Sequence, residues 1–424
     1  MRVLIVNTSD KTGGAAVAAN RLKDALNNNG VKAKMLVRDK ITDDVTVVGL
    51  AQGVRTKWNL LWERWCVFWH LRLSRKHLFE IDIANIGADI TKLREFQEAD
   101  IIHLSWINQG MLSIDNIRRI LASGKPVVWT MHDLWPASSI CHYAHGCEGF
   151  KCGCGNCRLL PGGGSKNDLS AKVFRKKKAI FSHNNIWFVA CSQWLAGQAR
   201  QSGLLTEQFV TNIPNPIDTH FFCPQDKAKT RQTLGLPAEK KVILFVSQRV
   251  TDKRKGMDFF IAAIERLARQ YPTWQSSACI AILGSHAEDL TQALAMPVYP
   301  LGYVTDAQQI CNVYNAADVF VLPSLEDNLP NTIMEAMACG VPCVGFRVGG
   351  IPEMIDHRLN GYVAAERDSR DLAEGIAWTL ADENHTRLSL GAVEKVRRCY
   401  SHHSVAMRYI EVYNQAIASK NYQI

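Results

Sequence analysis

Residues 319–346 read VFVLPSLEDNLPNTIMEAMACGVPCVGF, which alternates apolar runs with a polar loop and a helical pattern. The run Val319–Leu322 predicts a strand, Thr332–Ala338 a helix and Pro342–Phe346 a second strand. Short, almost wholly apolar strands separated by a helix are typical of a parallel sheet that is covered on both faces.

The same alternation extends in both directions along the chain. Strands are predicted before this stretch at Val3–Asn7, Val31–Arg38, Ile101–Leu104, Val127–Met131, Ile186–Ala190, Thr211–Ile213, Val242–Val246, Cys279–Leu283 and Val298–Leu301. Helices are predicted at Ala15–Asn28 and Ser404–Ala418. The fold class is therefore α/β, and the proline-rich segment Ile213–Asp218 suggests two doubly wound domains.

We expect a first domain over residues 1–222, with a cysteine-rich insertion near 137–164. A second domain should cover 223–403, and a C-terminal helix over about 404–424 should pack back on the first. A chain of 424 residues is long enough for two sizeable cores.

Composition excludes several classes of protein. The chain is 47% hydrophobic and 21% charged, which is unlike a disordered or fibrous protein. No uncharged apolar stretch approaches the roughly 18–20 residues of a membrane span. The first residues, MRVLIVNTSD, lack the apolar core and cleavage site of a signal peptide, so we expect a cytoplasmic protein.

The formal net charge of +9 is unevenly distributed. Residues 1–222 hold 28 Lys and Arg against 18 Asp and Glu, which leaves 21 against 22 for residues 223–424. A positive first half points to an anionic partner for that half, and nucleic acid, an anionic membrane and a diphosphate all fit this sign.

Glycines and cations follow two of the predicted strands. Gly13 and Gly14 stand between the first strand and the first helix, where glycine permits a tight turn and the helix end offers free N–H groups. A turn of this kind is also common for purely structural reasons. Arg249 ends a later strand and Lys255 lies six residues on, a pair of cations that suits a diphosphate or a solvated loop.

The opening stretch contains two carboxylates of interest. Asp327 lies in the loop and Glu335 lies in the helix. A carboxylate at this place could accept hydrogen bonds from the vicinal hydroxyls of a ribose, while the helix N-terminus faces phosphate. The alternative is an ordinary capped helix with a surface acid.

These residues resemble the donor domain of the retaining glycosyltransferases of family 4. The resemblance rests on Arg249 with Lys255, on residues 323–342 and on Gly349-Gly350-Ile351-Pro352-Glu353; Gly13-Gly14, His132-Asp133 and residues 213–216 follow in the family's order. It implies two facing Rossmann-like domains, the GT-B fold, with an interdomain cleft. One departure is Asp327, where the family's motif has a glutamate, so the donor sugar cannot be inferred.

The resemblance also implies roles for individual residues. Arg249 and Lys255 would neutralise the donor diphosphate, Glu335 would hold the ribose, and Asp327 would face the transferred sugar. The rest of the implied donor site comprises Gly13, Gly14, Asn328, Leu329, Asn331 and Thr332. The implied reaction retains the anomeric configuration, and no metal-binding DxD loop is evident, so we expect no catalytic metal.

His132 ends an apolar strand, which is the position of site residues in open parallel sheets. Its match to the family's strand-end histidine implies contact with the donor sugar, although a lone histidine is more often structural. Asp133 could orient the His132 imidazole or cap the next turn.

A cluster of cysteines follows. Cys154 and Cys157 form a C-x2-C pair, and Cys141 and Cys147 are our choice for the other half of a structural zinc site. His142 and Cys152 are possible substitutes, and reduced free thiols are the alternative. Similar cysteine-rich insertions occur in a subgroup of the family that resembles colanic-acid and exopolysaccharide glycosyltransferases.

An aromatic stripe with helical spacing precedes this cluster. It comprises Trp58, Leu61, Trp62, Trp65, Phe68 and Trp69, and it is flanked by Arg55, Lys57, Arg64, Arg72, Arg75 and Lys76. Tryptophan with Lys and Arg on an amphipathic helix suits a bilayer interface, whereas packing on the first sheet is the alternative. The run Arg175–Lys178 suggests a second cationic patch.

The sequence therefore predicts a glycosyltransferase at the inner face of the plasma membrane. Its partners would be a UDP- or GDP-sugar donor, a glycan or polyprenyl-diphosphate-linked acceptor of bacterial surface polysaccharide synthesis, and an anionic membrane. Two rival functions are a nucleotide-sugar epimerase and a zinc-containing nucleic-acid-binding protein. The cysteine spacing fits no standard zinc finger and the basic residues form no recognition helix, so nucleic acid is not an expected partner.

Overall fold

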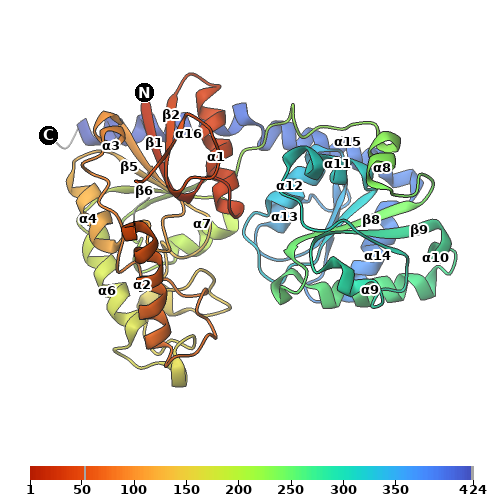
Figure 1. Cartoon of the computed structure of the whole chain (residues 1–424), viewed down its shortest axis with the longest axis horizontal. Helices are drawn as coiled ribbons and strands as arrows, with labels where there is room; N and C mark the ends of the chain where they lie inside the picture. Colours follow the sequence, from red (N-terminus) through yellow and green to blue (C-terminus); the bar gives the residue numbers. More distant parts are fainter. Residues whose placement is uncertain (52–53, 422–424) are drawn as a thin grey trace. The chain divides into compact units, whose positions relative to one another are not determined.

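A computed structural model of the chain describes residues 1–51 and 54–421 (Figure 1). The chain divides into two compact units. The first contains residues 1–216 together with the described residues from Val405 on, and the second runs from Ile217 to Ser404. The boundary therefore falls at Pro216, slightly before the expected residue 222. The C-terminal helix belongs mainly to the first unit.

The first unit is built on a seven-stranded sheet in the order β3-β2-β1-β4-β5-β6-β7. The strands are β1 (Arg2–Ser9), β2 (Lys32–Asp39), β3 (Val47–Gly49), β4 (Ile101–Leu104), β5 (Val127–Met131), β6 (Ile186–Ala190) and β7 (Phe209–Asn212). All neighbouring strands pair in parallel; in β1, for example, Val3 lies opposite Ala33 of β2 and Ile101 of β4.

Helices cover both faces of this sheet (Figure 1). They are α1 (Gly14–Asn27), α2 (Val54–His70), α3 (Arg94–Glu98), α4 (Ile114–Ala122), α5 (Gly149–Cys152), η1 (Pro161–Gly163), α6 (Leu169–Phe181), α7 (Gln193–Arg200) and α16 (His402–Asn421). Side chains of β1 alternate between two cores. Val3 and Ile5 pack with α1 and α16, whereas Leu4 and Val6 pack in the core that includes α4 and α6.

The second unit is built on a six-stranded parallel sheet in the order β10-β9-β8-β11-β12-β13. Its strands are β8 (Lys241–Arg249), β9 (Ala278–Ser285), β10 (Val298–Pro300), β11 (Val319–Leu322), β12 (Cys343–Phe346) and β13 (Gly361–Ala364). Its helices are α8 (Lys227–Leu234), η2 (Lys253–Lys255), α9 (Met257–Gln270), α10 (Trp274–Ser277), η3 (Ala287–Leu290), α11 (Ala307–Ala316), α12 (Asn331–Ala338), α13 (Ile351–Met354), α14 (Ser369–Leu380) and α15 (Asp382–Cys399).

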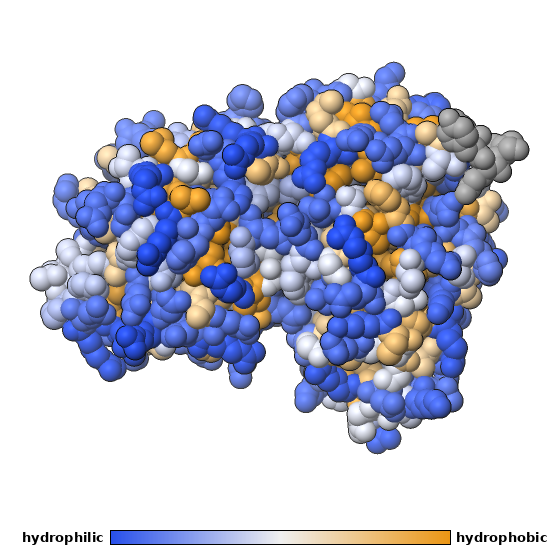
Figure 2. All heavy atoms as spheres, turned by 180° about the vertical axis from the view of Figure 1, so that it is seen from behind, coloured by the Kyte–Doolittle hydropathy of each residue, from blue (hydrophilic) through white to orange (hydrophobic). Residues whose placement is uncertain are grey.

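The opening stretch of sequence forms β11, α12 and β12 near the middle of this second sheet. Val319 and Val321 face the core shared with α9 and α14. The observed parallel sheets confirm the predicted α/β class. On the face drawn in Figure 2 hydrophilic residues predominate and apolar residues form separate areas.

Packing of α16 against the sheet of the first unit can be tested by mutation. Tyr409 is buried, and its hydroxyl lies 2.8 Å from Thr130 Oγ1 of β5. Tyr409→Ala removes a large aromatic ring and leaves a cavity, so we expect a loss of about 3–5 kcal/mol in the free energy of unfolding of this unit. Met407→Ala, at an exposed position of the same helix, should change it by less than about 0.5 kcal/mol. Equal effects of the two substitutions in urea unfolding would show that α16 is not part of the core.

Candidate functional site

Asp327 is the centre of the polar contacts that follow β11. The Nζ of Lys255 donates to Asp327 Oδ2 at 2.6 Å, and the Ser324 hydroxyl donates to the same oxygen at 3.3 Å. The guanidinium of Arg254 lies 3.6 Å from it. Since Lys255 ends η2 and Asp327 precedes α12, the ion pair joins the loop after β8 to the loop after β11.

The charges in this contact explain the state of the carboxylate. Burial by itself raises the pKa of Asp327, but the positive charges of Lys255 and Arg254 and the hydrogen bond from Lys255 outweigh burial, so the pKa lies below its usual value. Asp327 is therefore ionised at neutral pH.

Two glycines allow the loops to approach one another closely. Gly349 has φ +56°, and a Cβ there would lie 1.7 Å from the carbonyl oxygen of Asp327. Gly256 has φ +74°, and a Cβ there would lie 1.9 Å from the carbonyl oxygen of Pro323. Both positions require glycine, because a side chain would push the backbone of the site apart.

Glu335 and Thr332 belong to α12. The Tyr314 hydroxyl of α11 donates to Glu335 Oε2 at 2.9 Å and so holds the carboxylate in place. The Thr332 hydroxyl oxygen, at the first turn of α12, is buried and has no hydrogen-bond partner in the described structure. A helix N-terminus with an unsatisfied hydroxyl is suited to a ligand oxygen.

The remaining predicted donor residues lie around the same loops. Arg249 is exposed at the end of β8, and within the described residues its side chain forms no ion pair. Asn328 and Leu329 are buried, and Asn331 opens α12 and is half-buried. The second unit thus joins Lys255 and Asp327 in an ion pair, with Arg249 at the end of β8 and Glu335 in α12. The roles of these residues in donor binding remain a prediction.

Gly13 and Gly14 lie in the first unit. Gly13, with φ +91°, precedes α1 and has no atom within 4 Å of an ideal Cβ, so its loop is open to solvent. Gly14 is the first residue of α1. Their assignment to the donor remains a prediction.

His132 follows β5 and is held by its neighbours. Its Nε2 lies 2.9 Å from Ser105 Oγ, and its Nδ1 lies 3.4 Å from Cys191 Sγ. Burial lowers the pKa of His132 to about 4 against the opposing effect of Asp133, so the imidazole is neutral at pH 7. Its contact with a donor sugar also remains a prediction.

Asp133 has partners other than the expected His132. It accepts hydrogen bonds from the Trp106 indole at 2.9 Å and from the Trp135 amide at 2.9 Å, and its Oδ2 lies 2.7 Å from His142 Nδ1. Asp133 therefore caps the following turn and orients His142. The ring of His142 also stacks on Trp106, with 5.7 Å between the ring centroids, and a role for His142 as a substitute metal ligand remains a prediction.

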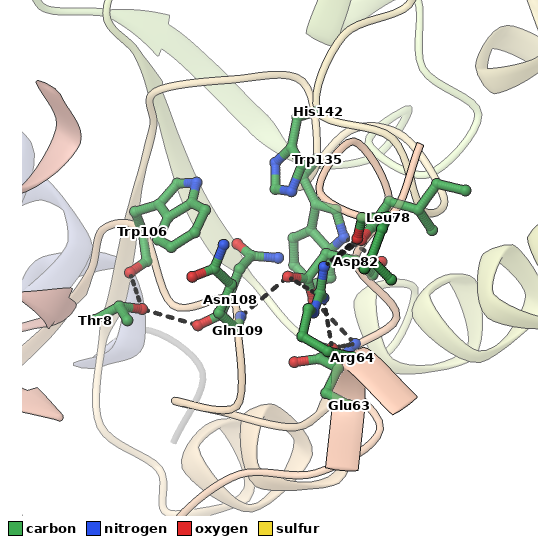
Figure 3. A network of polar contacts seen from close by, with 12 residues as sticks. Thr8, Glu63, Arg64, Leu78, Asp82, Trp106, Asn108, Gln109, Trp135 and His142 are labelled. Atoms are coloured by element: carbon green, nitrogen blue, oxygen red, sulfur yellow. Dashed lines mark hydrogen bonds and ion pairs between the residues drawn. The ribbon is translucent and has the colours of Figure 1, made fainter. Parts of the chain in front are cut away.

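A second network of polar contacts in this unit, around α2, was not predicted from the sequence (Figure 3). Arg64 of α2 donates to Asp82 Oδ2 at 3.2 Å, and the same Asp82 oxygen accepts from the Gln109 amide at 3.0 Å. Glu63 Oε1 accepts from the Ala84 amide at 2.7 Å. Arg64 is therefore a buried anchor rather than one of the flanking cations of the aromatic stripe.

The four predicted zinc ligands are free thiols. Burial raises the pKa of Cys141 to about 11 and that of Cys154 to about 12, so these thiols are protonated when no metal ion is bound. In residues 1–51 and 54–421 no group of three or more His, Cys, Asp or Glu is placed to hold a metal ion. Cys141, Cys147, Cys154 and Cys157 are thus not assembled as metal ligands, and zinc binding remains a prediction.

The second cationic patch is also smaller than expected. Lys177 is buried, donates to the carbonyl oxygens of Trp135 at 2.6 Å and Ser138 at 3.1 Å, and lies over the Trp135 ring. Burial lowers the pKa of Lys177 to about 7. Its ammonium group therefore supports the loop after β5 and does not face solvent.

Comparisons with known proteins identify the family of this chain. The family model described as Glycosyltransferase Family 4 matches residues 12–221, and the model described as Glycosyl transferases group 1 matches residues 240–382. The chain belongs to the family 4 glycosyltransferases, which have the GT-B fold.

The individual proteins that resemble this chain have low sequence identity to it. A D-inositol 3-phosphate glycosyltransferase of Saccharomonospora viridis is 28% identical over 230 residues, which are 50% of this chain and 51% of that protein. The chain thus spans about half the length of this curated relative. Sucrose-phosphate synthase from Thermosynechococcus elongatus has a TM-score of 0.68 at 19% identity, over 99% of this chain and 100% of that chain. Anabaena HepE, solved in complex with UDP-glucose, has a TM-score of 0.60 at 18% identity and covers 100% of both chains.

The ion pair predicts a change in acid stability. Since the folded-state pKa of Asp327 is lowered, its carboxylate stabilises the fold at neutral pH, and this contribution disappears as the pH falls through the folded pKa. Lys255→Met removes the positive charge that contributes most to lowering the pKa of the buried Asp327 carboxyl. Acid unfolding of the second unit should therefore begin about one pH unit higher. Circular dichroism against pH measures this.

The matched control is Lys253→Met, which removes an exposed lysine two residues away. It should leave the acid transition where it is in the wild type. If Lys255→Met also leaves it unchanged, the ion pair does not set the charge state of Asp327.

Zinc analysis tests the cysteine prediction. Protein purified under reducing conditions should contain stoichiometric zinc, and a Cys154→Ser/Cys157→Ser double variant should lose it, because thiolates are the ligands. Cys399→Ser, in the second unit, should retain it. Wild-type protein without zinc, after growth in zinc-supplemented medium, would contradict the prediction.

Proposed function

We propose that this protein is a retaining glycosyltransferase that moves a sugar from a UDP- or GDP-sugar to a glycan acceptor. The observation that carries the proposal is the ion pair between Lys255, which follows β8, and Asp327, which follows β11; Arg249 ends β8 and Glu335 lies in α12. Family membership supports the same reaction class.

The cations would stabilise the leaving group. Breaking the bond between sugar and diphosphate leaves negative charge on the diphosphate, and fixed positive charges lower the barrier to that step. Arg249 offers a planar guanidinium that can bind two oxygens, and Lys255 supplies a point charge. The carboxylate of Asp327 holds the Lys255 ammonium at 2.6 Å, so this charge is positioned before a donor arrives.

Glu335 would hold the nucleoside. Its carboxylate is fixed by Tyr314 and is suited to accept hydrogen bonds from two vicinal ribose hydroxyls. The buried Thr332 hydroxyl and the first turn of α12 would contact the phosphates. Asp327 and residues 328–332 would then face the transferred sugar.

Similar proteins support a nucleotide-sugar donor. Anabaena HepE, whose fold is similar, was solved with UDP-glucose. The sugar that this chain uses is a separate question, because Asp327 stands where the family motif has a longer glutamate.

For the acceptor we propose a polyprenyl-diphosphate-linked glycan of bacterial surface polysaccharide synthesis. The enzyme would work at the cytoplasmic face of an anionic membrane. The positive excess of residues 1–222 supports this, since a donor diphosphate needs only the few cations of the second unit. In the described part of the chain no helix is long and apolar enough to cross a membrane.

Calorimetry with UDP, GDP and ADP tests the donor site. One nucleotide should bind and raise the melting temperature. Glu335→Gln should weaken its binding about tenfold or more, because a charged acceptor for the ribose hydroxyls is lost. The matched control is Glu374→Gln, which removes one member of the exposed ion pair between Arg370 and Glu374. This variant should bind the nucleotide as the wild type does.

Radiolabelled sugar assays separate transfer from its rival. A transferase labels a prenyl-diphosphate glycan, whereas an epimerase converts the nucleotide sugar without acceptor. If no nucleotide binds the wild type, or if Glu335→Gln and wild type bind alike, the donor assignment is wrong.

A further inference from the structure

Helix α2 turns its tryptophans toward solvent. Trp65 is 52% exposed and Trp69 is 65% exposed, although aromatic side chains are usually buried. We define the tryptophan face as Trp58, Leu61, Trp62, Trp65, Trp69, Leu73 and Phe79, which are all exposed. These are seven of the fourteen exposed large apolar side chains in the described part of the chain. Such a concentration marks an interaction surface.

The opposite side of α2 carries buried polar side chains. Glu63 has no exposed surface and Arg64 is 9% exposed. The Arg64 guanidinium donates to the carbonyl oxygens of Leu78 at 2.7 Å and Ile81 at 3.0 Å as well as to Asp82 (Figure 3). An ordinary surface helix places its apolar side chains inward and its polar side chains outward, and α2 does the reverse at Glu63 and Arg64.

This buried network prevents α2 from turning its tryptophans inward. Rotation of the helix would separate Arg64 from three acceptors and Glu63 from the Ala84 amide. Removing a partner from a buried charge is far more costly than exposing one apolar side chain. The tryptophan face is therefore a fixed feature of the folded unit.

Cations follow the tryptophan face along the chain. Arg72, Arg75 and Lys76 are exposed, in the turns directly after α2, and we call them the basic segment. Arg72 and Leu73 have φ of 54° and 61°, so the chain bends immediately after the helix. Arg55 and Lys57, two of the predicted flanking cations, are not among the residues whose side chains the structure describes.

We propose that the tryptophan face and the basic segment together form a docking surface for an anionic lipid bilayer. Indole rings are amphipathic and favour the boundary between headgroups and acyl chains, and the basic segment complements anionic headgroups. The helix lies in the plane of the bilayer with its apolar side inserted to a depth of about 5–10 Å.

The inference rests on the proposed function in one respect. A lipid-linked acceptor would be presented to the enzyme at such a surface. Binding to lipid is nevertheless a property of the first unit and requires neither donor nor acceptor. A soluble acceptor would therefore leave the docking surface without a role in the reaction but would not abolish docking.

Sedimentation of the full chain with lipid vesicles tests the docking surface. In low salt the wild type should bind vesicles of phosphatidylglycerol and phosphatidylcholine, and bind phosphatidylcholine vesicles much more weakly. Brominated lipids should quench its tryptophan fluorescence. Both signals should fall at least about tenfold in Trp62→Gln/Trp65→Gln/Trp69→Gln.

A second variant tests the charges. Arg72→Gln/Arg75→Gln/Lys76→Gln should weaken binding to anionic vesicles by about fivefold for each residue neutralised. Matched controls in the second unit are Lys229→Gln/Arg266→Gln/Arg269→Gln for charge and Leu390→Gln for exposed apolar surface. Neither control should change binding.

Three results would overturn the inference. The first is a wild type that does not sediment with anionic vesicles, and the second is a tryptophan variant that binds as the wild type does. The third is a wild-type dimer that dissociates in the tryptophan variant without any vesicle binding, which would assign the face to a second copy of the chain. Nucleotide binding, measured on the same variants, should be unchanged, so failure of docking and failure of the donor site are distinguishable.

Discussion

Both units depend on one constraint, the parallel pairing of every named strand. Parallel strands all end at the same edge of their sheet, so residues from distant parts of the sequence meet there. In the second unit this brings Lys255, which follows β8, to Asp327, which follows β11. In the first unit it brings Trp106, which follows β4, to Asp133, which follows β5. Apolar strands build the sheets, and the loops after them hold the charges.

The second unit shows how such an edge becomes a binding site. Asp327 is buried and stays ionised because Lys255 and Arg254 surround it. The same arrangement keeps the Lys255 ammonium in place, so little ordering remains to be done when an anionic ligand binds. Gly256 and Gly349 let the backbones come close enough for this, and a side chain at either position would separate the loops.

Much of this fold could be predicted because its signals are local. The strands at 101–104, 127–131, 186–190 and 319–322 have the expected bounds, since each is a short apolar run with clear ends. Two strands were missed. β3 has only three residues, and β13 begins with Gly361, a residue that disfavours strands.

Asp327 and Glu335 could be proposed as donor residues because they lie in one loop and in the helix that follows it. The partners of Asp133 could not be predicted, because Trp106 follows a different strand and His142 returns to Asp133 through the irregular segment after β5. For the same reason Arg64 and Lys177 were placed among the surface cations. Each of them binds a buried partner that is distant in the sequence, and no local sequence pattern predicts such a contact.

The account of the donor site can be tested by comparing ligands that differ only in their phosphates. The affinities of UDP and uridine, and of GDP and guanosine, should be measured for the wild type and for Lys255→Met. We expect the wild type to bind one diphosphate much more tightly than its nucleoside, and Lys255→Met to lose most of that difference while it still binds the nucleoside. If Lys255→Met prefers the diphosphate as strongly as the wild type does, Lys255 does not bind the diphosphate and the central claim is wrong.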